Sequence, residues 1–293
     1  MKKTFLGMMV IAIVCASCEK SMLHEDESGN TGKKKSITFK MKGGFGTPQR
    51  RANGSGQRLS TQVKGSAMTD VWVLDYVNGE LKQKIHQGDN TASDFGSPTL
   101  SLSMGNHELY FVCSMGGTPM LNIDEHKITW GIPRDTFWKK ITKNIKTNTA
   151  GNMTITLDRV ATRLSANIED ALPVGLVKVE ITPTKWYYGL NYFTGNGTDM
   201  KSDVFTINVP TSYAGRTNTR VYIFGLAQDE EFATNATITA KEDNGNVLAT
   251  QTITGAPMQK NRSTDYTGTL FLSDNSLGLS INDEWNTAWN GTW

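Results

Sequence analysis

Cys18 is the residue whose neighbours most clearly specify a chemical modification. The chain begins MKKTFLGMMVIAIVCASC, with Lys2 and Lys3 at the start, an apolar run from Thr4 to Val14, and small residues just before the cysteine. This order is typical of a bacterial lipoprotein signal, which predicts removal of residues 1–17 and a diacylated Cys18 at the new N-terminus. Two or more acyl chains hold a protein stably on a bilayer, so the sequence predicts a tethered protein. Two alternatives remain open, a plain secretory signal and an uncleaved helix, although the apolar run is shorter than the ~20 residues that a span needs.

The other cysteines and the histidines predict no further chemistry. Cys113 ends the run Leu109–Cys113, which has the composition of a strand, and it has no disulfide partner once Cys18 carries lipid. We expect a buried, inert thiol, with a reactive thiol as the alternative. No pair of histidines has zinc-site spacing, so we predict no metal and no cofactor. The four histidines are His24, His86, His107 and His126.

Acidic pairs are the remaining groups that could support catalysis. They lie at 124–125, 169–170 and 229–231. A glycosidase needs two carboxylates that face each other across roughly 5–9.5 Å, and neighbouring acids on one loop do not establish such an arrangement. We therefore predict no catalytic residues and no enzymatic activity.

The aromatic segment 186–193 could instead bind a sugar. Its sequence is WYYGLNYF, and Trp186, Tyr188 and Tyr192 are candidates for stacking on sugar rings. The alternative is a hairpin whose rings pack between two sheets, and we favour that alternative.

The C-terminal residues carry three further tryptophans at even spacing. On a strand, Trp285, Trp289 and Trp293 would share one face. Three such side chains bury about 450–750 Å², which is at or above the largest apolar patch usual on a monomer. The tail is therefore expected either to close its own sheet or to pair with a sheet edge of another subunit.

The elements that must position these residues are mainly strands. From Ser36 onward, apolar and polar residues alternate with period two between turn residues, and Asn78-Gly79 is a strong hairpin signal. Residues 134–146 are the exception: Phe137, Ile141 and Ile145 recur every fourth residue, which favours one amphipathic crossover helix. The sequence predicts a mainly β protein with two β-sandwiches in tandem. We place the signal at 1–17, a flexible spacer at 18–35, and the two sandwiches at 36–160 and 161–293.

Charge and hydropathy exclude several partners. The chain has 30 Lys+Arg and 28 Asp+Glu, and loss of Lys2 and Lys3 with the signal brings these into balance. No basic field would attract nucleic acid. Beyond the signal, no apolar run approaches membrane length, so acyl lipid on Cys18 is the predicted membrane contact.

Four stretches, taken in order, resemble one family. They are VWVLDYVNGELK at 71–82, NMTITLDRVATRLSANIED at 152–170, MQKNRSTDYTGTLF at 258–271 and INDEWN at 281–286. The second resembles an Arg-x-x-Ala-Arg-type strand, with Arg159, Ala161 and Arg163 in those places. With the lipidated Cys18, the chain resembles the Bacteroidetes-type fimbrillin superfamily, and most of all its FimB-like anchor or minor-subunit lipoproteins.

The resemblance implies a fold and a role. The implied fold is two tandem transthyretin-like, Greek-key type β-sandwiches, and the implied role is a lipid-anchored fimbrial subunit on the outer membrane, facing the cell exterior. Its partners would be other fimbrial subunits, joined by β-strand addition. Shaft subunits of the superfamily are cut after an arginine, for which Arg50, Arg51 and Arg58 are candidates, whereas anchors keep their first strand and lipid. The alternative function is a surface lipoprotein that binds a polysaccharide or adhesion target through its aromatic residues.

Overall fold

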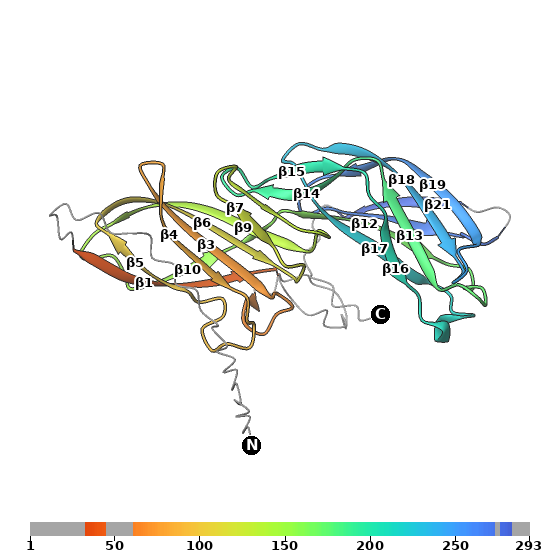
Figure 1. Cartoon of the computed structure of the whole chain (residues 1–293), viewed down its shortest axis with the longest axis horizontal. Helices are drawn as coiled ribbons and strands as arrows, with labels where there is room; N and C mark the ends of the chain where they lie inside the picture. Colours follow the sequence, from red (N-terminus) through yellow and green to blue (C-terminus); the bar gives the residue numbers. More distant parts are fainter. Residues whose placement is uncertain (1–32, 45–60, 273–275, 283–293) are drawn as a thin grey trace, which may run out of the picture.

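The computed structural model describes residues 33–44, 61–272 and 276–282, and these residues are mainly β (Figure 1). The strands form several antiparallel and mixed sheets. The helix content of the described residues is one short 3-10 turn, Thr211–Tyr213. Figure 1 shows two β-rich halves placed side by side along the long axis of the molecule. The predicted mainly β class is therefore confirmed.

The N-terminal half contains two facing sheets. One has the strand order β10-β1-β2, with β5 also paired to β1, and the other has the order β11-β9-β6-β3-β4. The strands are β1 (Lys34–Gly43), β2 (Thr61–Gln62), β3 (Asp70–Val77), β4 (Glu80–Gln87), β5 (Thr99–Ser103), β6 (Gly105–Ser114), β9 (Thr136–Ile145), β10 (Asn152–Thr156) and β11 (Asp158–Arg159).

The alternating residues of these strands form the core between the two sheets. Ile37, Phe39 and Met41 of β1 are at most 1% exposed and belong to one cluster with Val73 and Phe111 of the opposite sheet. Asn78 and Gly79 join β3 to β4 with positive φ angles of 52° and 80°, the backbone that a tight hairpin turn needs. The hairpin predicted from this dipeptide is confirmed.

The helix predicted at 134–146 is wrong, because residues 136–145 form strand β9. β9 pairs with β6 along its whole length. Phe137, Ile141 and Ile145 do share one face, and all three pack in the N-terminal core. Four-residue spacing is a multiple of two, so it places side chains on one face of a strand as well as near one face of a helix.

The C-terminal half also contains two sheets. One has the order β21-β20-β12-β17-β14-β8-β7, with β15 paired to β14, and the other has the order β16-β13-β18-β19. The strands are β7 (Met120–Asn122), β8 (Lys127–Thr129), β12 (Ala161–Ile168), β13 (Lys178–Pro183), β14 (Trp186–Asn191), β15 (Asn196–Lys201), β16 (Phe205–Asn208), β17 (Thr219–Leu226), β18 (Phe232–Lys241), β19 (Val247–Met258), β20 (Ser263–Gly268) and β21 (Leu277–Asn282).

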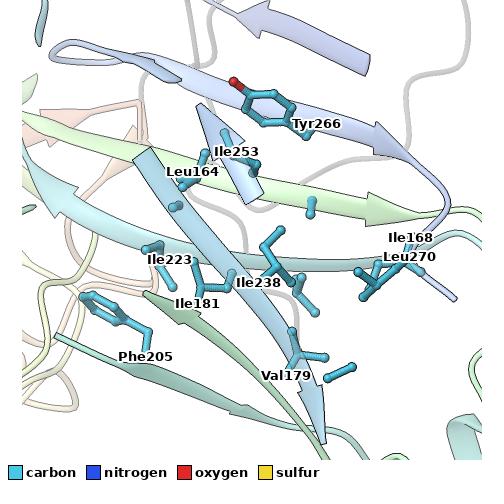
Figure 2. Close-up of a cluster of buried hydrophobic side chains, with 14 of the residues drawn as sticks. Leu164, Ile168, Val179, Ile181, Phe205, Ile223, Ile238, Ile253, Tyr266 and Leu270 are labelled. Atoms are coloured by element: carbon cyan, nitrogen blue, oxygen red, sulfur yellow. The ribbon is translucent and has the colours of Figure 1, made fainter. Parts of the chain in front are cut away.

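A second core fills the space between these two sheets (Figure 2). Leu164 of β12 and Ile223 of β17 point from one sheet toward Ile181 of β13 and Ile238 of β18 in the other (Figure 2). All four side chains are at most 4% exposed. The two sheets are therefore held together by apolar contact, as expected of a sandwich.

A third cluster joins the two halves. Leu74 of β3 and Tyr110 of β6 lie on the outer face of the N-terminal half, and they cluster with Ile128, Leu190 and Leu226 of the C-terminal half. The hairpin β7–β8 strengthens this connection. It precedes β9 of the N-terminal half in the chain, but its strand β8 pairs with β14 of the C-terminal half. The halves thus share both a buried cluster and a sheet.

Among the described residues, no helix has the length and apolarity required to cross a membrane.

Candidate functional site

The first strand of the described chain is built into the centre of its sheet. β1 pairs in parallel with β10, with Thr38 opposite Asn152, and antiparallel with β5, with Ile37 opposite Leu100. Full burial of an apolar side chain such as Phe39 stabilises a fold by roughly 1.5–3 kcal/mol. Because β1 contributes three such side chains, it is integral to the N-terminal core.

Arg159, the first arginine of the Arg-x-x-Ala-Arg-type motif, forms a buried ion pair with Asp135. Its Nε lies 2.8 Å from Asp135 Oδ1 and its Nη2 lies 3.1 Å from Oδ2. The two side chains are 2% and 0% exposed. The same guanidinium contacts Asn261 Oδ1 at 3.3 Å and the Gly44 carbonyl at 3.4 Å. One side chain therefore links the end of β1, the start of β9 and the turn before β20.

Arg163, the second arginine of the motif, lies inside the C-terminal half. Its Nε donates to Ser263 Oγ at 2.9 Å, and its Nη2 is 3.7 Å from Asp265. Burial lowers the pKa of Arg163 to about 10, while the charge of Asp265 opposes that shift. The side chain couples β12 to its parallel neighbour β20.

Tyr192 is the centre of the junction between the halves. Its hydroxyl lies 2.7 Å from the hydroxyl of Tyr76, and its carbonyl accepts a hydrogen bond from Trp138 Nε1 at 2.8 Å. Phe193 stacks on His126 and on Tyr110, with centroid distances of 3.9 and 4.7 Å. Burial raises the pKa of Tyr192, which stays protonated here. This packing makes the junction a structural connection.

The aromatic residues proposed for sugar stacking lie inside the protein. Trp186 and Tyr192 are 0% exposed, and Tyr188 is 3% exposed. Trp186 donates from Nε1 to the Phe224 carbonyl at 2.8 Å. The Tyr188 ring stacks on Phe205 with a centroid distance of 5.6 Å, and the Lys201 ammonium lies 3.9 Å from its centroid. Buried rings offer no face to a sugar, so the structure corresponds to the alternative of a hairpin packed between sheets.

Strand β21 lies at the edge of the larger C-terminal sheet. It pairs with β20, with Tyr266 opposite Leu279 and Thr264 opposite Ile281. Its other edge has no strand partner among the residues that the structure describes. Leu279 is 51% exposed and Ile281 is 44% exposed. This edge therefore offers unpaired backbone groups together with apolar side chains.

Several predicted site residues lie outside the described residues. They are the lipidation site Cys18, the processing candidates Arg50, Arg51 and Arg58, and the tail residues Trp285, Trp289 and Trp293. These assignments remain predictions.

Sequence reasoning missed a cluster in which half-buried Ser103 lies beside buried His107 and Asp75. His107 Nδ1 lies 2.7 Å from Asp75 Oδ1, and His107 Nε2 lies 3.2 Å from Ser103 Oγ. The same Nε2 lies 3.0 Å from the Ser103 carbonyl, which only accepts hydrogen bonds. A proton on Nε2 would satisfy that carbonyl and would leave Nε2 without a lone pair with which to activate the serine. Burial raises the pKa of Asp75, and the hydrogen bond to His107 opposes that shift.

Cys113 is buried, and burial raises the pKa of its thiol well above the usual value. The expected burial is confirmed, and the raised pKa disfavours the reactive thiolate. Within the described ranges, no group of three or more histidine, cysteine or acidic side chains is placed to hold a metal ion.

Solved structures share the fold at low sequence identity. A candidate polysaccharide-binding protein from Bacteroides thetaiotaomicron is similar over 86% of this chain and 96% of its own, with a TM-score of 0.53 and 11% identity. A candidate adhesin from Bacteroides ovatus is similar over 84% of this chain and 95% of its own, with a TM-score of 0.51 and 8% identity. The match to the fimbrial anchor protein Mfa2 from Porphyromonas gingivalis covers 85% of this chain and 98% of that protein at 10% identity, with a lower TM-score of 0.43.

No curated protein matches the sequence significantly. The model of a family of unknown function, DUF6562, matches residues 125–293. This range includes the arginine motif, the junction residue Tyr192 and the edge strand β21. Because the match spans more than half of the sequence, the chain belongs to the DUF6562 family.

Proposed function

We propose that this protein is a lipid-anchored, cell-surface fimbrial subunit, either an anchor or an accessory component. Acylated Cys18 would hold it in the outer membrane, with the body facing the cell exterior. The sandwiches of 36–160 and 161–293 would be tandem transthyretin-like domains. Other fimbrial subunits would associate with it by β-strand addition.

The position of β1 is the observation that carries this proposal. β1 lies between β10 and β5, and its residues Ile37, Phe39 and Met41 are in the core. A protein that keeps this strand keeps a covalent connection from its core to Cys18. Cleavage after Arg50, Arg51 or Arg58 would separate β1 from the rest of the chain and leave a groove. The integral strand agrees with an anchor-type subunit, which keeps it, and a shaft subunit would lose it on cleavage.

The edge strand β21 supports strand addition as the mode of assembly. An unpaired edge with exposed Leu279 and Ile281 is the kind of surface to which another strand pairs. The three tryptophans that follow this strand in sequence would extend the contact. The similarity to proteins described as adhesins agrees with a surface role.

Analysis of the N-terminus of the mature, cell-associated protein tests the anchor assignment. We expect an acylated Cys18 as the first residue. A start just after Arg50, Arg51 or Arg58 would instead identify a shaft subunit and refute the proposed anchor.

Deletion of residues 283–293 tests the assembly mode separately. The shortened protein should still reach the membrane with its lipid, but it should no longer co-purify with fimbrial subunits. Normal co-purification would exclude the tail as the contact.

Capture of a polysaccharide is a second candidate function. It is favoured by the similarity over 86% of the chain to a candidate polysaccharide-binding protein. Trp186, Tyr188 and Tyr192 are buried, so a binding surface would have to lie elsewhere.

A further inference from the structure

A cavity of about 600 Å³ opens at one side of the N-terminal half. Its volume lies within the roughly 300–1,000 Å³ usual for small-molecule sites. The lining comes from the end of β9, the start of β10 and the turn between them. The lining residues are Lys143, Asn144, Lys146, Asn148, Thr149, Ala150 and Met153.

The cavity lies where the two sheets of the N-terminal half have open edges. In the described chain, β10 pairs with β1 alone, and β11 covers β9 only at Phe137 and Trp138. Side chains two residues apart on a strand share a face, so Lys143 points to the same side as the core residues Ile141 and Ile145. Met153 of β10 packs against that core from the other sheet. The cavity is thus polar at its mouth and has an apolar contact at its base.

The lysines of this cavity differ from their neighbours on β9. Lys139 pairs with Asp158 at 2.8 Å and Lys140 pairs with Glu108 at 3.1 Å. Within the part of the chain that the structure describes, Lys143 forms no ion pair, and the same holds for Lys146. Among the residues that the structure describes, none with a carboxylate lines the cavity. Two uncompensated ammonium groups at a concave surface favour an anionic ligand.

The turn that carries the polar groups is held in place. Lys146 donates its backbone N–H to Thr149 Oγ1 at 2.8 Å, and Thr149 donates its own to the Lys146 carbonyl at 3.0 Å. Lys35 Nζ donates to the Thr147 carbonyl at 2.6 Å. Asn144 Nδ2 is bonded to Asn106 Oδ1 at 2.7 Å, which fixes the orientation of its amide. Groups held in this way lose little freedom when a ligand binds.

We propose that this cavity binds an acidic oligosaccharide segment. The ammonium groups of Lys143 and Lys146 bind its carboxylate or sulfate. The amide of Asn148 provides donors and an acceptor for sugar hydroxyls, and Met153 contacts an apolar ring face. The inference deepens the second function proposed above, on which it rests, and it is independent of fimbrial assembly.

Binding to three oligosaccharides of equal length tests the site. Full-length protein in detergent is titrated calorimetrically with oligogalacturonate, with a sulfated oligosaccharide and with a neutral malto-oligosaccharide. The site variant carries Lys143→Glu and Lys146→Glu. The control variant carries Lys84→Glu and Lys185→Glu, which change the net charge equally at places outside the cavity lining.

We expect at least one acidic probe to bind better than the neutral one, and more weakly at high salt. The site variant should lose roughly tenfold or more in affinity, because hydrogen bonds to charged groups are the strong ones. The control variant should bind like wild type. Comparison of the carboxylated with the sulfated probe then identifies the preferred anionic group.

Three results would overturn the proposal. Equal binding by the site and control variants would show that a saccharide binds elsewhere, and the second proposed function would stand. Absence of binding by wild type to every probe would remove both the site and that function. Equal binding of poly-glutamate by wild type would show that the cavity selects charge alone and is not a saccharide site.

Discussion

Removing one member of the buried pair Arg159–Asp135 should destabilise the protein strongly, whereas removing both should not. Arg159→Met leaves the Asp135 carboxylate buried without its cation, and Asp135→Leu leaves the guanidinium buried without its anion. Both side chains are at most 2% exposed. Breaking a buried pair in this way costs about 3–5 kcal/mol of unfolding free energy.

The double variant should recover much of that loss. With both charges gone, the remaining deficits include the lost bonds of Arg159 to Asn261 Oδ1 and the Gly44 carbonyl, at 3.3 and 3.4 Å, and its contact with the Phe137 ring. Replacing a whole buried ion pair with apolar residues is often neutral or stabilising. We therefore expect a coupling energy of roughly 3 kcal/mol or more between the two positions.

Urea unfolding of the four proteins of the cycle, followed by tryptophan fluorescence, gives this coupling energy. The neighbouring pair Lys139–Asp158 provides the control, since its N–O distance is also 2.8 Å but its side chains are 38% and 62% exposed. The cycle with Lys139→Met and Asp158→Leu should give a coupling energy below about 1 kcal/mol. Burial would not be the cause of strong coupling if the losses of unfolding free energy at Arg159 and Asp135 were additive. The same would hold if the two cycles gave equal coupling energies.

Three further variants test the junction, the buried carboxyl and the aromatic hairpin. Gly195→Ala should destabilise the protein by about 1–3 kcal/mol more than Gly215→Ala. Both glycines have positive φ, but only at position 195 would an added Cβ contact the Trp138 ring, at 2.7 Å. Equal losses of unfolding free energy in urea would argue against this contact. Burial raises the pKa of Asp75 above 3.8, so the folded state binds the carboxyl proton more tightly than the unfolded state does. The unfolding free energy of wild type, measured relative to Asp75→Asn, should therefore fall as the pH rises above that value. An increase with pH would contradict a raised pKa. Trp186→Ala should cost about 3–5 kcal/mol in denaturation, and a stable variant that had lost only polysaccharide binding would reverse the interpretation of this ring as core.

The strands were predictable because their pattern depends on the alternation of neighbouring residues in the sequence. Ile37, Phe39 and Met41 alternate with polar residues, and the structure buries all three. Asn78-Gly79 specifies a turn by its own backbone preferences. Where the signal is local and strong, sequence and structure agree.

The error at 134–146 has a different origin. The apolar spacing of Phe137, Ile141 and Ile145 fits both periods, and the choice between them depends on β6, which is distant in sequence and pairs along the whole segment. A helix over 134–146 would place Asp135 near its start, whereas the structure pairs Asp135 with Arg159. Tertiary pairing, which a local pattern cannot reveal, decided the outcome.

The candidate sites were harder to predict than the strands. Trp186 and Tyr188 are aromatic in either role, and only the packing of β14 against its neighbours shows that their faces are covered. A helix over 134–146 would give no indication of the cavity that Lys143 and Lys146 line. The sequence does not show whether a lysine has a carboxylate near it in space.

The parallel pairings of β1 with β10 and of β12 with β20 have a consequence for folding. Lys35 is hydrogen-bonded to a residue 112 positions later, and Arg163 to one 100 positions later. Long loops must close before either contact is gained, and proteins dominated by such distant pairings fold in about milliseconds to seconds or more slowly. During that interval the edge of β1 that pairs with β10 has no partner, although β5 can already cover the other edge. A chain synthesised from its N-terminus would therefore have to remain unaggregated until residues 152–156 become available to it.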